Sequence, residues 1–183
     1  MSNIEPLSRQ ISEVNFLQAN GFRFNVQRAP TVGFFGNAIN VPGLELGVAQ
    51  QTTYLKSVPR PGEVLEFNNL TLRFLIDENL QNYNEIQRWM RGIGFPESLQ
   101  QIYDFQNEGN IKNDGGDLDL YSDGTLTILN GISKPLFSVH FKEMFPISLS
   151  DINFDATVTD AEYLTADVTF AYLIYNFEPF ECC

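Results

Sequence analysis

The chain contains few of the residues that usually carry out chemistry. Its 183 residues include only two cysteines, Cys182 and Cys183, and one histidine, His140. Adjacent cysteines rarely bridge each other without strain, so no disulfide framework is implied and synthesis in a reducing cytoplasm fits best. An exposed tail is a better interpretation of the cysteine pair than a metal site, and we expect no metal and no cofactor.

Enzyme motifs are missing as well. The segment IDENLQNY, at 76–83, joins an expected strand to an expected helix without the glycines of a phosphate-binding loop. There is no G-x-S-x-G motif. The acidic segment 114–123 lacks the ligand spacing of an EF-hand, which favours a solvated loop over a calcium site. We predict no catalytic residues and no enzyme activity, although a carboxylate pair for glycoside hydrolysis stays open because three dimensions set its spacing.

Basic charge and long apolar runs are also scarce. The chain has 11 Lys and Arg against 23 Asp and Glu, a net charge of −12. Phosphate binding needs clustered Lys and Arg, so specific nucleic-acid binding is disfavoured. No stretch approaches the ~20 apolar residues of a membrane span, and the first residues lack the apolar core of a signal peptide. We expect no membrane association.

Aromatic residues, by contrast, are abundant, and they favour strands. There are 16 Phe and 7 Tyr, and the length suits a single domain over 1–183. In GFRFNVQR, from Gly21, the apolar and polar residues alternate, which predicts a strand with one buried face. The apolar set is Phe22, Phe24 and Val26, and the outward set is Arg23, Asn25 and Gln27.

The next segments predict a second strand, a loop, a third strand and a helix. The second strand is expected within 31–46, with a Pro42-Gly43 turn. The polar, proline-containing segment 47–62 predicts a long extended loop. In the third strand Leu70, Leu72, Phe74 and Ile76 face inward, Thr71 and Arg73 face outward, and a bulge at Asn68-Asn69 adds Leu65 and Phe67 to the inner face.

The expected helix begins after Asp77 or Asn79, either of which can cap it, and Gly92 and Gly94 end it. Its apolar stripe is Leu80, Tyr83, Ile86, Gln87, Met90 and Ile93.

The remaining segments predict loops followed by strands. An N-terminal arm covers 1–20, and the variable segment 95–124 forms loops with one short strand near 118–121. Further strands are expected in 123–130, 134–146, 148–159 and 161–179, the last covered on both faces. The predicted fold is mainly β (α+β): an antiparallel β-sandwich or barrel with one helix packed on it.

This order of elements resembles the tube protein family of contractile phage tails. The resemblance covers roughly 21–92 and 125–178 and is carried by an ordered set of short motifs. In the first half these are Gly62-Glu63, Phe67, Leu70-Thr71-Leu72, Asp77-Glu78-Asn79 and Trp89. In the second half they are Pro146, Asp155, Asp160-Ala161-Glu162 and Val168-Thr169-Phe170.

The resemblance implies a structural virion protein, assembled in the host cytoplasm and located in the tail. Homohexameric rings would stack into a hollow tube that contacts the sheath, baseplate and tail terminator proteins, and DNA would pass through without specific binding. The segment 47–62 would stack the rings, with an inter-ring interface at Thr53, Tyr54, Leu55, Val58, Pro59 and Arg60. The lumen-facing residues would be Arg23, Asn25, Gln27, Thr71 and Arg73. A negative lumen would repel DNA phosphates, although solubility alone explains the same net charge.

Three alternatives remain open at this point. A relative that initiates or terminates the tube, at the baseplate or head end, has the same pattern, and the type VI secretion tube is a further relative. A carbohydrate-binding β-sandwich would need exposed aromatics. The candidates are Tyr54, Trp89, Tyr103 and Tyr121, although Trp89 borders the apolar stripe of the helix and is expected to be packed.

Overall fold

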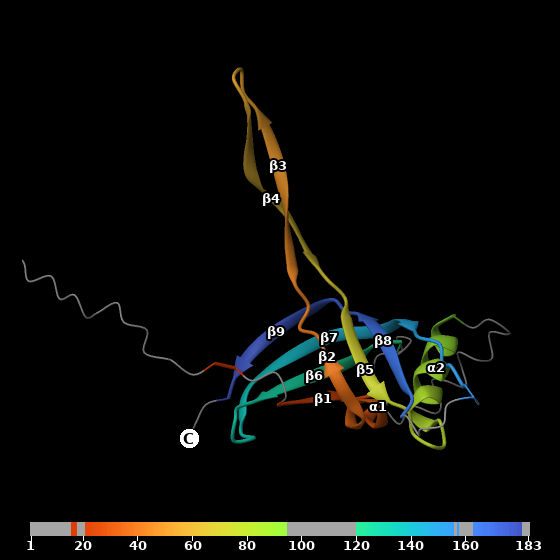
Figure 1. Cartoon of the computed structure of the whole chain (residues 1–183). Helices are drawn as coiled ribbons and strands as arrows, with labels where there is room; N and C mark the ends of the chain where they lie inside the picture. Colours follow the sequence, from red (N-terminus) through yellow and green to blue (C-terminus); the bar gives the residue numbers. More distant parts are fainter. Residues whose placement is uncertain (1–15, 18–20, 95–119, 156, 158–162, 181–183) are drawn as a thin grey trace, which may run out of the picture.

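The computed structural model describes residues 16–17, 21–94, 120–155, 157 and 163–180. These residues form a body, built from a seven-stranded sheet and two helices, and a two-stranded ribbon that projects from it (Figure 1). The predicted antiparallel, mainly β fold with a packed helix is confirmed. Most of the predicted arm 1–20, most of 95–124 and the Cys182-Cys183 tail lie outside the described residues.

The elements of the body follow one another along the chain with the ribbon inserted after β2. They are β1 (Phe22–Val26), α1 (Pro30–Phe34), β2 (Gly36–Ile39), the ribbon strands β3 (Leu44–Thr52) and β4 (Ser57–Phe67), β5 (Leu70–Leu75), α2 (Gln81–Gly94), β6 (Ser122–Leu129), β7 (Pro135–Leu149), β8 (Thr165–Ala171) and β9 (Ile174–Pro179).

The long strand β7 connects the two halves of the body. The strand order is β1-β6-β7-β8-β5-β2, and β9 also pairs with β7. The first part of β7 pairs with β6 and β9, whereas its end, from Phe145, pairs with β8. Between these parts Glu143 has a positive φ of 53°, and its N–H donates to the Asp123 carboxylate at 3.1 Å. This bulge bends β7, so that the sheet curves around one core.

The predicted alternation of strand faces is confirmed in the body. Phe24 and Val26 on β1 are buried, and so are Leu70, Leu72 and Phe74 on β5. The intervening residues of both strands are exposed. The buried apolar residues contributed by the other elements include Val32, Ile86, Trp89, Leu126, Val139, Phe141, Met144, Val168 and Phe170.

Helix α2 covers this core through most of the predicted stripe, because Ile86 is buried and Tyr83, Met90 and Ile93 pack against the core. Gln87, however, is exposed, and Trp89 occupies the stripe instead, packed 6.1 Å from the ring of Phe170. The buried side chain of Asn82 joins the first turn of α2 to the end of β5, because its Nδ2 donates to the Leu75 carbonyl at 2.7 Å. Trp89 therefore belongs to the core, because it follows Ile86 by three residues and so lies on the same face of the helix.

The expected strand over 31–46 is wrong in its first part. Pro30 begins α1, a position where the missing N–H of proline costs nothing. A Cβ on Gly33 would lie 2.5 Å from the Phe24 carbonyl oxygen, so glycine lets this short helix rest directly on β1. Only β2 and the start of β3 in this segment are strands.

Two strand predictions near the end of the chain also need correction. The segment 161–179 is two strands, because the chain turns at 172–173, where the Leu173 N–H donates to the Lys142 carbonyl at 3.0 Å. The strand expected over 148–159 is only the end of β7, since residues 150–155 and 157 are not in a strand. β9 was expected to be covered on both faces, but Ile174 and Phe177 are 38% and 54% exposed.

Candidate functional site

The projecting ribbon is formed by β3 and β4, where the sequence predicted a loop over 47–62. The two strands pair antiparallel, Leu44 opposite Phe67 at the base and Thr52 opposite Ser57 at the far end. The two-stranded pairing tolerates Pro59 and Pro61 because each strand has an outer edge that needs no N–H donor. The segment 47–62, whose composition is typical of a loop, therefore forms part of a regular two-stranded ribbon.

The middle of the ribbon contains a bulge at two glycines. The register shifts between Leu46 and Val48, opposite a longer stretch of β4. A Cβ on Gly62 would lie only 2.5 Å from the Gly47 carbonyl oxygen, so the two backbones approach too closely for any side chain there. Since β4 gains two residues relative to β3, the bulge keeps the alternation of faces in phase.

The ribbon ends in a tight turn over 53–56. The Thr53 N–H and hydroxyl donate to the Lys56 carbonyl, at 3.1 and 2.5 Å. The turn leaves the side chains of Tyr54 and Leu55 almost fully exposed, at 102% and 90%. All six residues predicted for an inter-ring interface thus lie in the far part of the ribbon, and that role stays a prediction.

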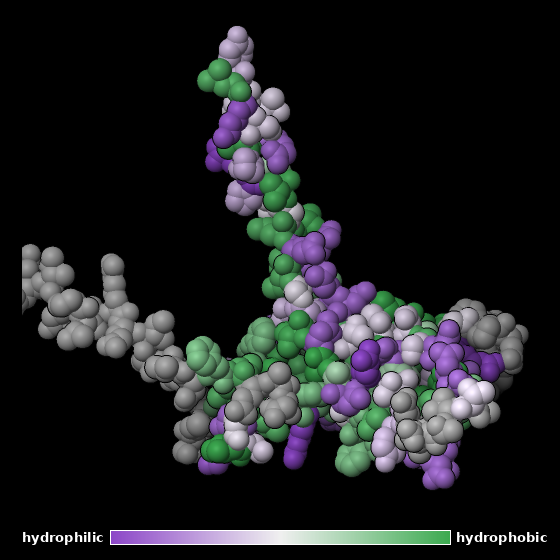
Figure 2. Space-filling model, in the orientation of Figure 1, coloured by the Kyte–Doolittle hydropathy of each residue, from purple (hydrophilic) through white to green (hydrophobic). Residues whose placement is uncertain are grey.

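One face of the ribbon is apolar along most of its length. It carries Leu44, Leu46, Val48, Pro59, Pro61 and Leu65. The four aliphatic side chains are between 48% and 63% exposed. Figure 2 shows green, apolar surface along the lower ribbon that reaches the body. We call this set the apolar ribbon face. The prediction missed its lower half, although the alternation in LELGV was a signal for it.

The opposite ribbon face carries charged residues, although Ala49 and Val58 also lie on it. Glu45 lies directly opposite Glu66, a like-charge pair that a ribbon does not favour by itself. Further out, Arg60 Nε donates to the side-chain oxygen of Gln51 at 2.8 Å. The apolar residues of the ribbon are therefore concentrated on one face but not confined to it. Leu65, which was predicted to share the buried face of β5, is exposed because β4 leaves the body before the core begins.

Two tyrosines hold the base of the ribbon. The Tyr172 hydroxyl donates to the Asn68 carbonyl at 2.7 Å, and the Tyr175 hydroxyl donates to the Pro42 carbonyl at 3.0 Å. The ring of Phe67 lies 6.2 Å from Tyr172 and 5.7 Å from Tyr175. Burial, followed by the proximity of Tyr175, raises the pKa of Tyr172 to about 12.

The residues predicted to face a lumen are all exposed, but they form two separate groups on different strands. Arg23 and Asn25 are on β1, and Gln27 follows it, whereas Thr71 and Arg73 are on β5. β6, β7 and β8 separate the two strands along the sheet. The structure does not bring the two groups together, and their role stays a prediction.

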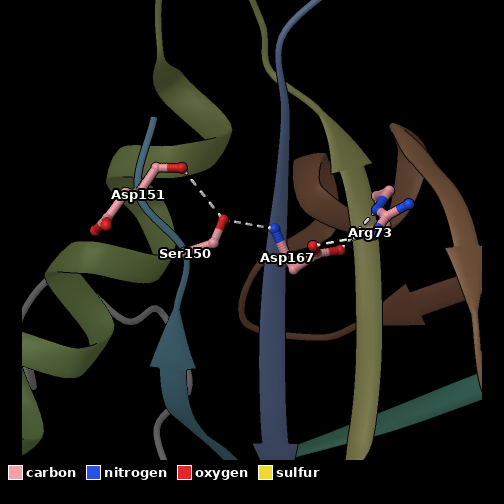
Figure 3. A network of polar contacts seen from close by, with 4 residues as sticks. All are labelled: Arg73, Ser150, Asp151 and Asp167. Atoms are coloured by element: carbon pink, nitrogen blue, oxygen red, sulfur yellow. Dashed lines mark hydrogen bonds and ion pairs between the residues drawn. The ribbon is translucent and has the colours of Figure 1, made fainter. Parts of the chain in front are cut away.

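Arg73 is already paired within the body (Figure 3). Its Nε and Nη2 donate to the two carboxylate oxygens of Asp167, on the neighbouring strand β8, at 2.8 and 3.2 Å. This hydrogen-bonded pair raises the pKa of Arg73 above its ordinary value. The Asp167 N–H in turn donates to the Ser150 hydroxyl at 2.9 Å. The network braces the end of β7 against β8 and β5.

A shallow polar groove of about 300 Å³ lies on the outer face of β6, β7 and β9. His140 Nε2 is 3.3 Å from a Glu178 carboxylate oxygen, and its Nδ1 is 3.1 Å from the Thr125 hydroxyl. These polar groups satisfy one another at the surface of the sheet. No group of three or more metal-binding side chains occurs among the described residues. Within the same residues, no helix has the length and apolar character of a membrane span.

The aromatic residues considered for carbohydrate binding do not form one surface. Trp89 is 1% exposed, and its indole N–H donates to the Leu120 carbonyl at 2.9 Å. Tyr54 lies at the ribbon tip, and Tyr121 packs beside Phe145 on the body. Tyr103 lies outside the described residues. The packing predicted for Trp89 is thus confirmed.

Comparisons with known proteins place this fold. No protein-family model matches the chain. The tail tube terminator protein of Enterobacteria phage T4 is 24% identical over 181 residues, covering 94% of this chain and 95% of the relative. A chain of the anti-feeding prophage baseplate superposes with a TM-score of 0.61 at 12% identity, covering 93% of this chain and 99% of that one. A chain from the PVC sheath/tube terminator, part of an extracellular contractile injection system, gives 0.54 at 16%, covering 91% and 99%.

The curved antiparallel body therefore shares its fold with these chains of contractile injection systems. The match along nearly the whole sequence supports the contractile-tail tube family that the ordered motifs predicted.

Proposed function

We propose that this chain is a tube terminator, a ring-forming structural protein that binds the end of a contractile phage tail tube. The relative that matches 94% of the chain carries that name, and one of the similar structures is a sheath/tube terminator. The main prediction from the sequence, a tube protomer, is less well supported than this alternative. The proposed location is the virion tail, with the tube and sheath proteins as partners.

The observation that carries the proposal is the apolar ribbon face. Leu44, Leu46, Val48 and Leu65 stay about half exposed in the protomer. Contiguous exposed apolar surface marks interaction sites, and each Å² removed from water contributes about 25 cal/mol. A ribbon that stands away from the body exposes this face to a neighbouring ring, and a ring-to-ring contact is heterologous.

Charge along the ribbon would orient this contact. The far part carries the exposed cations Lys56 and Arg60, and the base carries the exposed anions Glu45, Glu63 and Glu66. Complementary charges set the register of an interface and its rate of formation more than its affinity. The partner surface near the tip is therefore expected to be acidic and that near the base basic. We further propose that the ring is a homohexamer whose lumen lets DNA pass without specific binding.

The test adds the gold-labelled full-length chain to tube protein from the same tail during polymerisation. A terminator labels one end of each tube, and the mean tube length falls as more of it is added. Label along the whole tube would identify a tube protomer. Label at one end with more tubes would identify an initiator, and unlabelled tubes would exclude all three roles.

A matched pair of ribbon variants tests the face that binds. Leu46 and its neighbour Glu45 lie on opposite faces of β3. Leu46→Ser should abolish end labelling, whereas Glu45→Ser should retain it. Equal binding by both variants would show that the apolar ribbon face is not the contact.

A further inference from the structure

The angle at which the ribbon leaves the body matters because the ribbon is long. β4 has 11 residues, and at about 3.3 Å per residue it spans about 35 Å. A tilt of about 10° at the base would therefore move the tip by about 6 Å, more than an interface tolerates. A two-stranded ribbon is also marginally stable by itself, so contacts at its base decide whether it points in one direction.

The chain passes between body and ribbon twice, at 40–43 and 67–70. The Asn68 N–H donates to the Gly43 carbonyl at 3.1 Å, which ties the two passages to each other. Asn40 Nδ2 donates to the Asn69 carbonyl at 3.2 Å. These bonds join the two passages to each other where β2 meets β5.

Tyr172 and Tyr175 add contacts from another part of the body, the corner between β8 and β9. Each hydroxyl donates to a different passage, one to the Asn68 carbonyl and one to the Pro42 carbonyl. The tyrosine rings lie 5.9 Å apart and pack on Phe141, 5.1 and 5.7 Å away, which anchors them in the core. Contacts on both passages from this second part of the body oppose rotation of the ribbon.

We propose that Tyr172 and Tyr175 are positioning residues that fix the angle of the ribbon, so that it docks as a rigid arm. The docking part rests on the proposed function, whereas the fixed angle does not. A preorganised arm avoids the ordering cost that a swinging arm would have on binding.

The angle is tested by pulsed electron paramagnetic resonance on the full-length chain. Cys182→Ser and Cys183→Ser first remove the two natural cysteines. Spin-labelled side chains then replace Thr52, at the end of the ribbon, and Arg23, on β1. The labelled chain that keeps Tyr172 and Tyr175 should give one narrow distribution of distances between the two labels. The double variant Tyr172→Phe with Tyr175→Phe should widen it at least twofold.

A third tyrosine provides the matched control. The Tyr83 hydroxyl donates to the Ser150 carbonyl at 3.1 Å, away from the ribbon. Tyr83→Phe removes a comparable bond and should leave the distance distribution narrow. Unchanged width in the double variant, or equal widening in Tyr83→Phe, would overturn the fixed angle.

Tube capping separates this proposal from the proposed function. If the chain caps tubes, the double variant should cap them only at an about tenfold higher concentration than Tyr83→Phe requires. The two variants are compared at a matched melting temperature. Equal capping by both variants, despite a widened distribution, would overturn the docking role. If no version of the chain caps tubes, the proposed function fails, whereas a widened distribution would still support the fixed angle.

Discussion

The body and the ribbon are built from the same alternation of apolar and polar residues, yet they differ in burial. On β5, Leu72 is fully buried between β2 and β8. On β3, Leu46 has the same character and is 54% exposed. The difference is that β5 has a strand on both sides and a core beneath it, whereas β3 pairs with β4 alone among the described strands.

The comparison shows that a period of two predicts which side chains share a face, and that neighbours decide whether the face is buried. A strand face in a monomer's core and a strand face kept for a partner have the same sequence pattern. In this chain the uncovered face belongs to the element that we propose as the docking arm. Four predictions test the contrast, in order of decreasing effect.

The largest effect is expected from truncating one leucine in each region. Leu72→Ala should lower the free energy of unfolding by about 2–5 kcal/mol, because it leaves a cavity in the core. Leu46→Ala should change it by no more than about 0.5 kcal/mol. Urea titration of both variants measures the difference. A similar loss in both would mean that the ribbon packs within the protomer.

Adding a methyl group at one glycine in each region should produce a smaller contrast. The Cβ of Gly124→Ala would overlap the sulfur of buried Met144, which should cost about 1–3 kcal/mol. Gly62→Ala would clash with the Gly47 backbone and open the ribbon bulge, with little effect on the body. Thermal melting and amide exchange over 48–61 distinguish the two. For Gly62→Ala, but not for Gly124→Ala, we expect faster amide hydrogen exchange in the ribbon without a lower melting temperature.

Alkaline pH should weaken the connection between the regions through Tyr172. The pKa of this hydroxyl is raised to about 12 by burial first and Tyr175 second, against about 10 in an unfolded chain. The folded state therefore favours the neutral form. This stabilisation is complete below about pH 10 and is lost as the pH rises to about 12. In Tyr172→Phe, urea titrations should depend less on pH in that window, and an identical pH dependence would contradict the assignment.

The smallest effect is expected at the surface pair of Arg73 and Asp167. Both side chains are about half exposed, at 54% and 41%, and water and salt screen such pairs. Arg73→Gln should shift the urea midpoint less than Leu72→Ala or Gly124→Ala does, and the shift should vanish at high salt. A shift that persists in 1 M salt would show that the hydrogen bonds, rather than the charges, carry the contribution.

Much of the body was predictable because its signals are local. The strand at Phe22–Val26 and the buried set on β5 follow from alternation, and the helix after 80 follows from its spacing. The errors fall where a single close contact decides the backbone. Gly33 beneath β1 turns an expected strand into α1, and the 172–173 turn divides an expected long strand into β8 and β9.

The candidate site was predictable in position but not in form. Tyr54, Leu55 and Val58 indicated a segment that needs an outside surface, and the family resemblance assigned it to stacking. The prolines indicated a loop, whereas the segment is a ribbon, because a free strand edge accepts proline. The tyrosines at its base were not singled out, since more than 100 residues separate Tyr172 from Asn68 along the chain.

By itself the sequence determined that the chain has few chemical groups, strands with regular alternation, one amphipathic helix and an ordered set of motifs. These properties depend on residue type and on spacing within a few positions. Only the tertiary structure decided which apolar faces are covered, where Arg73 finds its partner and how the ribbon is held to the body. Such contacts join strands far apart in the chain, and their energies depend on distances of a few ångströms that local spacing does not encode.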